Sequence, residues 1–263
     1  MSEQFVSTVI DERGVATVTL DNPEKHNAFD DTIIRQLTEA FTAVDGDSGV
    51  GVMVLASNGK SFSAGGDLGW MKRMARYTHE ENLADSQALA EMLRSLNFMS
   101  KPTIARVQGA AFGGAVGLVS CCDMAVASTA AKFSLSEVKI GLIPATISPY
   151  VVAAIGNRAA RRYFNTAERF SAERARELGL VSELVADESE LDEAVEAMVQ
   201  ALLGNSPAAV AASKSLIFDV ADRVIDEDLI EMTCQRIADI RASAEGQEGL
   251  SAFLEKRKPA WIQ

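Results

Sequence analysis

Apolar and polar residues alternate near the start of the chain, in FVSTVI and VATVTL on either side of the turn DERG. A period of two residues is typical of a strand with one buried face, so this pattern predicts a β-hairpin. A helix is expected next, because Asp30 or Asp31 can cap its N-terminus and apolar residues follow at helical spacing: Ile33, Ile34, Leu37, Ala40 and Phe41.

Two later segments of the chain each consist of a short apolar strand, a glycine-rich turn and a helix. In the first cycle the strand GVMVLASN is followed by the loop GKSFSAGGD and the helices LGWMKRMARY and EENLADSQALAEMLRSLNFM. In the second, the strand TIARVQG is followed by the helix AFGGAVGLVS and the strand DMAVAS. Repeated units of this kind predict a layered α/β core in which successive turns of the chain stack on one another.

From Leu191 onward the pattern is almost entirely helical, through LDEAVEAMVQALLG, AAVAASKSLIFDVAD, DEDLIEMTCQRIADIRAS and EGQEGLSAFLEKRKP. The prediction is therefore an α/β core over residues 1–190 and a helical C-terminal region over residues 191–263. Helices with exposed apolar faces favour a partner, and the simplest partner is a second copy of this chain.

The composition of the chain mainly excludes certain classes of function. The chain has 263 residues, of which 48% are hydrophobic, and its 25 basic and 37 acidic residues give a net charge of -12. This charge has the wrong sign for binding nucleic acid through its phosphates, so no nucleic-acid partner is expected. We find neither a secretion signal nor an apolar run of about 18 residues, and so we expect a soluble, cytoplasmic protein that does not bind a membrane.

The three cysteines, Cys121, Cys122 and Cys234, have the spacing of neither a disulfide framework nor a zinc site. We expect all three to be reduced core residues. No cluster of His, Cys or carboxylate residues has metal-ligand spacing, and no serine lies in a GxSxG motif. Neither metal-dependent hydrolysis nor a serine nucleophile is therefore expected.

The two glycine turns, SAGGD at 63–67 and FGG at 112–114, lie at predicted junctions between a strand and a helix. Glycine lets the backbone approach a ligand there, and the first N–H groups of a helix have no partner within it. Two such groups from separate turns could form an oxyanion hole for a thioester carbonyl, although glycine also serves tight turns and close helix packing. Neither turn has the pattern of a nucleotide-binding loop.

Glu137 is the candidate for proton transfer, because it lies in the largely apolar segment AKFSLSEVKIGLIP. A carboxylic acid in an apolar pocket has a raised pKa and can accept and donate a proton near neutral pH. The alternative is a solvent-exposed glutamate paired with Lys132 or Lys139.

Motifs in a specific order and spacing resemble the enoyl-CoA hydratase/isomerase (crotonase) superfamily: KHNAF at 25–29, FSAGGDL at 62–68, VQGAAFGGAVGL at 107–118, CDMAVAS at 122–128 and FSLSEVKIGLIP at 133–144. The resemblance extends from about Phe5 to Pro259 and is greatest to bacterial 3-methylglutaconyl-CoA hydratases. It implies an α/β fold, a crotonase-like spiral of ββα turns with a C-terminal α-helical oligomerisation region, assembled as a homotrimer or homohexamer. The implied substrate is an acyl-CoA thioester, so coenzyme A is part of the substrate and no separate cofactor is expected.

The resemblance also implies roles for individual residues. Gly66 and Gly114 match the positions whose backbone N–H groups hold the thioester oxygen, and Glu137 matches a proton-transfer residue. The positions that shape the adenine and pantetheine site correspond to Lys25, Ala28, Ala64, Asp67 and Leu68. Phe253 and Lys256 resemble positions where a neighbouring subunit reaches the nucleotide of coenzyme A, or they belong to a solvated tail.

The helix that begins at Leu68 supplies further candidates. Trp70 and Met71, together with Met74 and Tyr77, are candidate walls of the acyl pocket, with an ordinary core role as the alternative. Arg76 could bind a distal carboxylate of the substrate, or it could be solvated or bind CoA phosphates, like Lys72 and Arg73.

One position departs from the family pattern. Many hydratases of the superfamily carry a second glutamate on the helix after the second glycine turn, and Gly117 occupies that position here. Three functions stay open: a hydratase for a branched glutaconyl-CoA from leucine or isoprenoid breakdown, a Δ3,Δ2-enoyl-CoA isomerase, or a non-catalytic acyl-CoA-binding subunit. We expect the hydratase, in which Glu137 deprotonates the attacking water and returns the proton to Cα.

Overall fold

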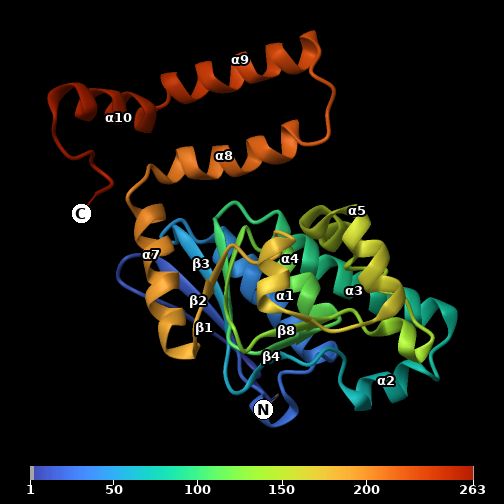
Figure 1. Cartoon of the computed structure of the whole chain (residues 1–263). Coiled ribbons are helices and arrows are strands. Elements are labelled where there is room, and N and C mark those ends of the chain that lie inside the picture. Colours follow the sequence, from blue (N-terminus) through green and yellow to red (C-terminus); the bar gives the residue numbers. More distant parts are fainter. Residues whose placement is uncertain (1–2, 263) are drawn as a thin grey trace.

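The structure, a computed structural model, describes residues 3–262. Within this range one sheet has the strand order β1-β2-β3-β5-β7-β10, from Val6–Ile10, Val15–Leu20, Val52–Ser57, Thr103–Val107, Met124–Ser128 and Glu183–Val185 (Figure 1). A second sheet has the order β4-β6-β8-β9, from Ser61–Ser63, Ala110–Phe112, Lys132–Ser134 and Phe170–Ser171. The strand pairs are parallel except for β1 with β2 and β8 with β9.

The α-helices of the described residues are α1 (Asp31–Gly46), α2 (Leu68–Met74), α3 (His79–Asn97), α4 (Gly114–Cys121), α5 (Ser148–Thr166), α6 (Ala172–Glu177), α7 (Leu191–Leu203), α8 (Pro207–Val220), α9 (Glu227–Ala242) and α10 (Ala244–Glu255). The described residues also include three 3-10 helices, each between a strand and the next α-helix: η1 (Pro23–Lys25), η2 (Glu137–Ile140) and η3 (Glu188–Glu190). No helix in residues 3–262 has the length and apolar character needed to cross a membrane.

The chain winds through three similar turns, each of which gives one strand to each sheet. These are β3 and β4 before α2, β5 and β6 before α4, and β7 and β8 before η2. The expected spiral of ββα turns is confirmed. The periodicity alone did not locate the second strand of the first two turns: the loop GKSFSAGGD contains β4, and β6 takes up the first two residues of the expected helix AFGGAVGLVS, so this helix begins only at Gly114. Strands of three residues are too short to show a period and form by pairing with neighbouring turns.

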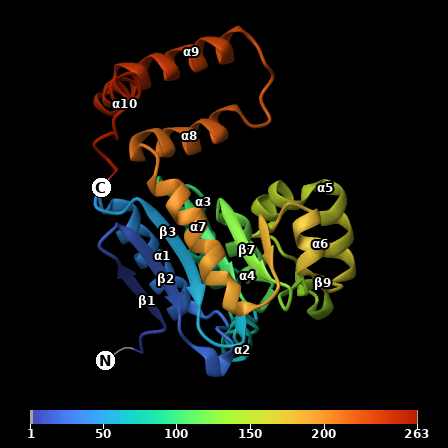
Figure 2. The same cartoon turned by 60° about the vertical axis from the view of Figure 1, so that its left-hand side comes forward.

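The predicted hairpin and first helix are confirmed. Asp30 caps α1, because its Oδ1 accepts a hydrogen bond of 2.9 Å from the Ile33 N–H. Alternate residues of β3 then decide which layer lies on which face of its sheet. Met53 and Leu55 belong to the apolar cluster that includes α1, α3 and α4, whereas Val52 and Val54 pack with α7 on the opposite face (Figure 2).

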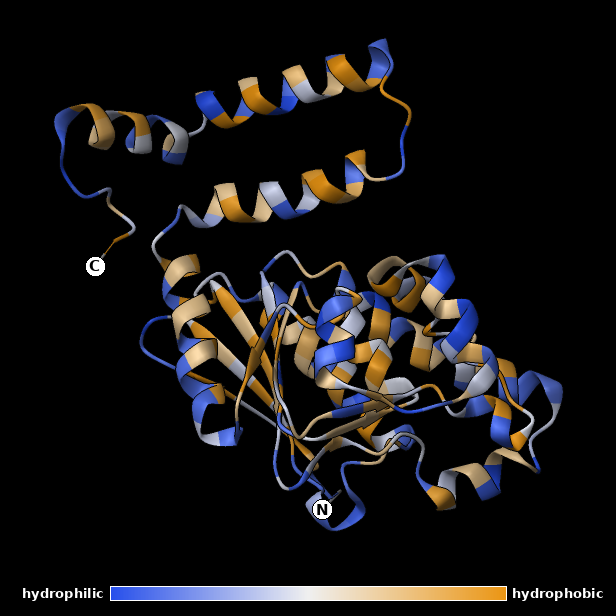
Figure 3. Cartoon of the chain, in the orientation of Figure 1, coloured by the Kyte–Doolittle hydropathy of each residue, from blue (hydrophilic) through white to orange (hydrophobic). Residues whose placement is uncertain are grey.

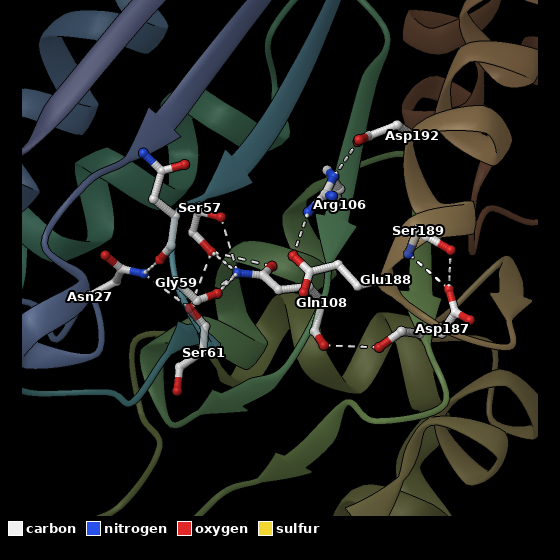
Figure 4. Close-up of polar contacts among 12 residues, drawn as sticks. Asn27, Ser57, Gly59, Ser61, Arg106, Gln108, Asp187, Glu188, Ser189 and Asp192 are labelled. Atoms are coloured by element: carbon white, nitrogen blue, oxygen red, sulfur yellow. Dashed lines mark hydrogen bonds and ion pairs between the residues drawn. The ribbon is translucent and has the colours of Figure 1, made fainter.

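Buried polar side chains tie successive turns of the spiral together (Figure 4). The Gln108 Nε2 donates to the carbonyls of Ser57 at 3.0 Å and Gly59 at 2.9 Å. The Asn27 Nδ2 donates to the carbonyls of Asn58 at 2.8 Å and Ser61 at 3.0 Å. These bonds satisfy carbonyls at the end of β3, in the loop that follows it and at the start of β4, so the connection between the two strands has a defined path.

The C-terminal helices differ in how they contact the core. α7 covers a sheet face, whereas α8, α9 and α10 extend away from the core (Figure 1). Figure 3 shows apolar residues along these three helices. The large apolar side chains that are exposed there are Ile217, Phe218, Ile230, Ile237, Leu250, Phe253 and Leu254. α8 is attached through the buried Lys214, whose Nζ donates to the Lys101 carbonyl at 3.0 Å and to Asp123 Oδ2 at 2.7 Å.

The cysteines are free thiols, of which Cys121 is buried and Cys122 is half-buried. Cys234 is exposed on α9, so the expectation that all three lie in the core is wrong for this residue. The reason is that α9 extends beyond the core and has little protein around it.

Candidate active site

A cavity of about 870 Å³ lies where both glycine turns, α2, α3 and the segment 136–147 meet. Eight of the predicted site residues line it: Ala64, Gly66, Leu68, Trp70, Met71, Met74, Gly114 and Glu137. The cavity therefore brings together the predicted backbone donors and the predicted proton-transfer residue. Its size is in the range of ordinary small-ligand sites.

The first glycine turn is held by backbone hydrogen bonds on both sides of Gly66. The Phe29 N–H donates to the Gly65 carbonyl and the Asp67 N–H donates to the Phe29 carbonyl, each at 2.7 Å. Gly65 has a φ of 92°, a backbone conformation that favours glycine. In residues 3–262 the Gly66 N–H has no hydrogen-bond partner, and Gly66 lines the cavity.

The second glycine turn connects β6 to α4. Gly113 has a φ of 54° and a ψ of -121°, which only glycine adopts without strain, and its N–H donates to the Ser134 carbonyl at 2.8 Å. Gly114 is the first residue of α4, and its N–H has no partner among the described residues. The N-terminus of a helix carries partial positive charge, so this N–H suits an oxygen that gains negative charge.

Glu137 lies directly over the second glycine turn. A Cβ placed on Gly113 would lie 3.2 Å from Glu137 Oε1, so the absence of a side chain at 113 makes room for the carboxylate. The Oε2 atom is buried without a hydrogen-bond partner in the described part of the chain, and burial raises the pKa of this carboxyl. The alternative of an exposed glutamate paired with Lys132 or Lys139 is not what the structure contains, because Glu137 forms no ion pair within residues 3–262.

The space beside Gly117 is filled by an apolar side chain. A Cβ on Gly117 would lie 2.4 Å from Ile147 Cγ2 and 3.4 Å from Leu93 Cδ2. Gly117 is therefore a packing glycine, and α4 approaches Ile147 more closely than any larger residue allows. A glutamate at this position would require Ile147 to move, so a second carboxylate is excluded by volume as well as by sequence.

Side chains from α2 and α3 form one wall of the cavity. Trp70 is buried, and its Nε1 donates to Asp85 Oδ1 at 3.0 Å, while Met71 and Met74 line the same wall. Tyr77, another predicted wall residue, does not line the cavity.

Sequence reasoning missed several residues that line the cavity: Phe29, Asn82, Asp85, Ser86, Lys139 and Ile147. Asn82, Asp85 and Ser86 follow one another at helical spacing on α3, and this polar stripe is a signal that could have identified them.

Several predicted residues lie outside the cavity lining. Lys25 and Asp67 form an ion pair with 3.5 Å between Nζ and Oδ2. Asp67 also caps α2, since its Oδ1 accepts from the Trp70 N–H at 3.0 Å. Burial opposes ionisation of Asp67, but the Trp70 N–H bond and the charge of Lys25 outweigh it and lower the pKa of this carboxyl. Ala28 is buried but does not line the cavity.

Arg76, Phe253 and Lys256 are exposed and do not reach the cavity. α2 ends at Met74, so the helical spacing that favoured Arg76 does not continue to that residue. Phe253 is 81% exposed on α10, which lies far from α2 (Figure 1). The arrival of these two C-terminal residues from a neighbouring subunit stays a prediction. Within residues 3–262 no cluster of His, Cys, Asp or Glu is arranged to hold a metal ion.

Comparisons with known proteins identify the family of the chain. A sequence model of the family "Enoyl-CoA hydratase/isomerase" matches residues 11–263. A putative enoyl-CoA hydratase of Thermus thermophilus is 33% identical over 93% of this chain and 96% of its own length. The 2,3-dehydroadipyl-CoA hydratase of Escherichia coli is 29% identical over 98% of both chains. A crystal structure of an enoyl-CoA hydratase from Shewanella pealeana matches with a TM-score of 0.95 and 48% identity, over 98% of this chain and 96% of that one.

The chain belongs to the enoyl-CoA hydratase/isomerase family. The expected superfamily and fold are thereby confirmed, and so is the expectation of an enzyme of the enoyl-CoA hydratase type.

Proposed function

We propose that this enzyme adds water to the α,β double bond of a branched glutaconyl-CoA, 3-methylglutaconyl-CoA or a close relative. The observation that carries the proposal is the position of Glu137, which lies over a glycine turn and lines a cavity, with its Oε2 and two backbone N–H groups there unpaired within residues 3–262. A buried base beside an oxyanion hole is the arrangement that proton transfer next to a thioester requires.

In the proposed reaction, Glu137 takes a proton from water while the water oxygen bonds to Cβ. The electron pair of the double bond moves toward Cα, and the thioester oxygen gains negative charge. The Gly66 and Gly114 N–H groups stabilise that charge, for which the N-terminus of α4 is favourable. Glu137 then returns the proton to Cα, and the sum of the steps is the addition of one water molecule.

A single carboxylate acts twice in this mechanism. Gly117 and Ile147 leave no space for a second glutamate, so Glu137 both removes and returns the proton, and both new bonds form on one face of the substrate. The substrate's own distal carboxylate can help to orient the water.

The cavity offers one cation for a distal carboxylate. Among the described residues that line it, Lys139 is the basic one, and it forms no ion pair within residues 3–262. One relative is named for 2,3-dehydroadipyl-CoA, whose acyl chain also ends in a carboxylate. Lys139 therefore replaces Arg76 as the proposed partner of the acyl carboxylate.

The packing of Gly117 also supports a second candidate, a Δ3,Δ2-enoyl-CoA isomerase. Isomerisation needs one carboxylate, which moves a proton from Cα to Cγ without adding water. Glu137 and the same backbone donors would serve that reaction as well.

The test incubates the purified protein with 3-methylglutaconyl-CoA, crotonyl-CoA and a 3-enoyl-CoA in heavy-oxygen water and follows product masses. We expect incorporation of water into 3-methylglutaconyl-CoA, and a fall in kcat of about 10²–10⁴-fold in Glu137→Gln. Glu193→Gln, at an exposed position on α7, is the matched control and should keep full activity. Double-bond migration without a gain of mass would establish the isomerase instead, and tight binding with no turnover would establish a binding subunit.

Lys139→Gln tests the acyl group separately. It should raise the KM for 3-methylglutaconyl-CoA about tenfold, since a hydrogen bond to a charged group contributes about 1.5 kcal/mol. The KM for crotonyl-CoA should not change, and Lys132→Gln, an exposed lysine outside the cavity lining, should change neither. An equal effect on both substrates would exclude a contact with the distal carboxylate.

We also propose that the chain self-associates as a homotrimer or homohexamer through α8–α10. Support comes from the exposed apolar residues of these helices, which a folded monomer would leave in water. The native mass in solution, measured by light scattering, distinguishes a monomer from either assembly.

A further inference from the structure

Phe29 contacts both glycine turns, which lie far apart in the sequence. Its backbone pairs with the first turn through both its N–H and its carbonyl, so that Gly66 lies between the two bonds. Its side chain packs against the second turn, because a Cβ placed on Gly114 would lie 3.0 Å from Cε2 and 3.1 Å from Cδ2 of the ring. Phe29 is 2% exposed and also lines the cavity.

The backbone of Phe29 is fixed by groups other than its own ring. The Ala64 N–H donates to the His26 carbonyl at 2.9 Å, and Asn27 is fully buried with its amide bonded to the carbonyls of Asn58, before β4, and Ser61, at its start. His26 and Asn27 both have a φ of 53°, which turns the chain so that Phe29 reaches the first glycine turn. A change in the ring of Phe29 therefore leaves its bonds to Gly65 and Asp67 in place.

We infer that Phe29 is a positioning residue that sets the separation between the Gly66 and Gly114 N–H groups. Its backbone is attached to one donor turn and its ring is the surface on which the other donor turn rests. Because even a Cβ on Gly114 would crowd the ring, the two donors have a fixed spacing before substrate binds. This inference rests on the proposed function, in which both donors hold one thioester oxygen.

The predicted signature is a loss of carbonyl polarisation without a loss of binding. An oxyanion hole acts only when both donors lie within about 2.7–3.1 Å of the oxygen, so a small shift of one donor weakens the transition state more than the bound substrate. Removing one such donor elsewhere costs about 10²–10³-fold in kcat. A shifted donor should cost less, and we expect a fall of about 10–100-fold.

The experiment compares Phe29→Leu with Phe41→Leu. Phe41 is a matched control because it is fully buried on α1 in the same apolar cluster but does not line the cavity. For each variant we would measure the melting temperature, kcat and KM with 3-methylglutaconyl-CoA. We would also measure the infrared stretching frequency of a carbon-13-labelled thioester carbonyl in a bound saturated acyl-CoA.

Phe29→Leu should lower kcat as stated, keep KM within about threefold, and move the carbonyl frequency back toward its value in solution. Phe41→Leu should lower the melting temperature but leave kcat and the carbonyl frequency as in the wild type. Wild-type kcat and frequency in Phe29→Leu would overturn the inference, and so would equal losses in the two variants. If Phe29→Leu does not fold, Phe29→Met retains more of the volume and takes its place.

Different results would overturn the proposed hydratase activity and the inference about Phe29. If the wild-type protein turns over none of the substrates, the hydratase proposal fails, but the carbonyl frequency of a bound thioester still reports whether Phe29 sets the donor spacing. If the wild type is active and the frequency does not respond to Phe29→Leu, only the inference about Phe29 fails.

Discussion

The two glycine turns present the same kind of backbone donor but are held by different forces. The first leads into α2, a seven-residue helix whose Leu68 is 74% exposed, and it is held by polar bonds from Asp67, Trp70 and the backbone of Phe29. The second leads into α4, where six of eight residues are buried and no side chain caps the N-terminus. One donor is therefore positioned by hydrogen bonds near the surface and the other by packing in the core, so added volume should harm the second more.

The sharpest test of this comparison is Gly114→Ala against Gly66→Ala. The new Cβ would lie 3.0 Å from the Phe29 ring in the first variant but 3.7 Å from Met71 and Trp70 in the second. We expect Gly114→Ala to lower kcat by about 100-fold, because the crowded turn moves a donor. Gly66→Ala should fold normally and lose much less, as measured by kcat and melting temperature. Equal losses would show that the two turns have the same tolerance.

The next largest effect is expected at Gly117. Gly117→Ala places a methyl group 2.4 Å from Ile147 Cγ2, and overpacking of this kind costs about 1–3 kcal/mol. Ile147→Ala removes the atom in conflict, so the double variant should be more stable than the sum of the single effects predicts. Denaturant unfolding of all four proteins measures this coupling, and additive effects would argue against direct contact.

The pH dependence of activity and stability reports on Glu137, whose carboxylate faces the second glycine turn. Burial raises the pKa of Glu137 above the usual value for a glutamate, so kcat/KM should fall on the acidic side as pH drops through this raised pKa. The effect of pH on stability has the opposite sign, because burial disfavours the ionised form of Glu137. The stability of the folded protein is therefore greatest below the pKa that Glu137 has in the unfolded chain, and part of it is lost as pH rises through the higher pKa of the folded state. Glu137→Gln should therefore melt no lower than the wild type at neutral pH. A clearly lower melting temperature would mean that the ionised carboxylate has stabilising partners.

The smallest effect is expected from the cap of α2. Asp67→Ala removes the acceptor for the Trp70 N–H, and loss of an N-cap costs about 1 kcal/mol. Because α2 forms a wall of the cavity, KM should rise a few-fold while kcat stays nearly constant. Asp226→Ala, which removes the equivalent cap of α9, is the control and should not change KM. A large fall in kcat for Asp67→Ala would mean that the first donor also depends on this cap.

The sequence was informative where a pattern is local. The hairpin, the cap of α1, the strands β3, β5 and β7 and the glycine turns all follow from short-range periodicity or residue type. The placement of Glu137 beside the second turn followed from the family resemblance and its apolar neighbours.

The contacts that define the site are long-range and left no local pattern. The ring of Phe29 rests on Gly114, and Ile147 fills the space at Gly117, but neither pair is close in sequence. Arg76 was assigned by extending a helical pattern past Met74, where the helix ends. β4, β6 and β8 have three residues each and form only because neighbouring turns of the spiral supply their partners.

The attachment of α8 makes its docking depend on the strands of the core. The acceptors of Lys214 come from two consecutive turns of the spiral, and Asp123 Oδ2 also accepts from the Thr103 N–H at 2.7 Å at the start of β5. A buried ammonium group is stable only when its acceptors are in place, so the docking of α8 depends on the pairing of β5 with β7. A change that loosens these two strands should therefore also release α8 from the core.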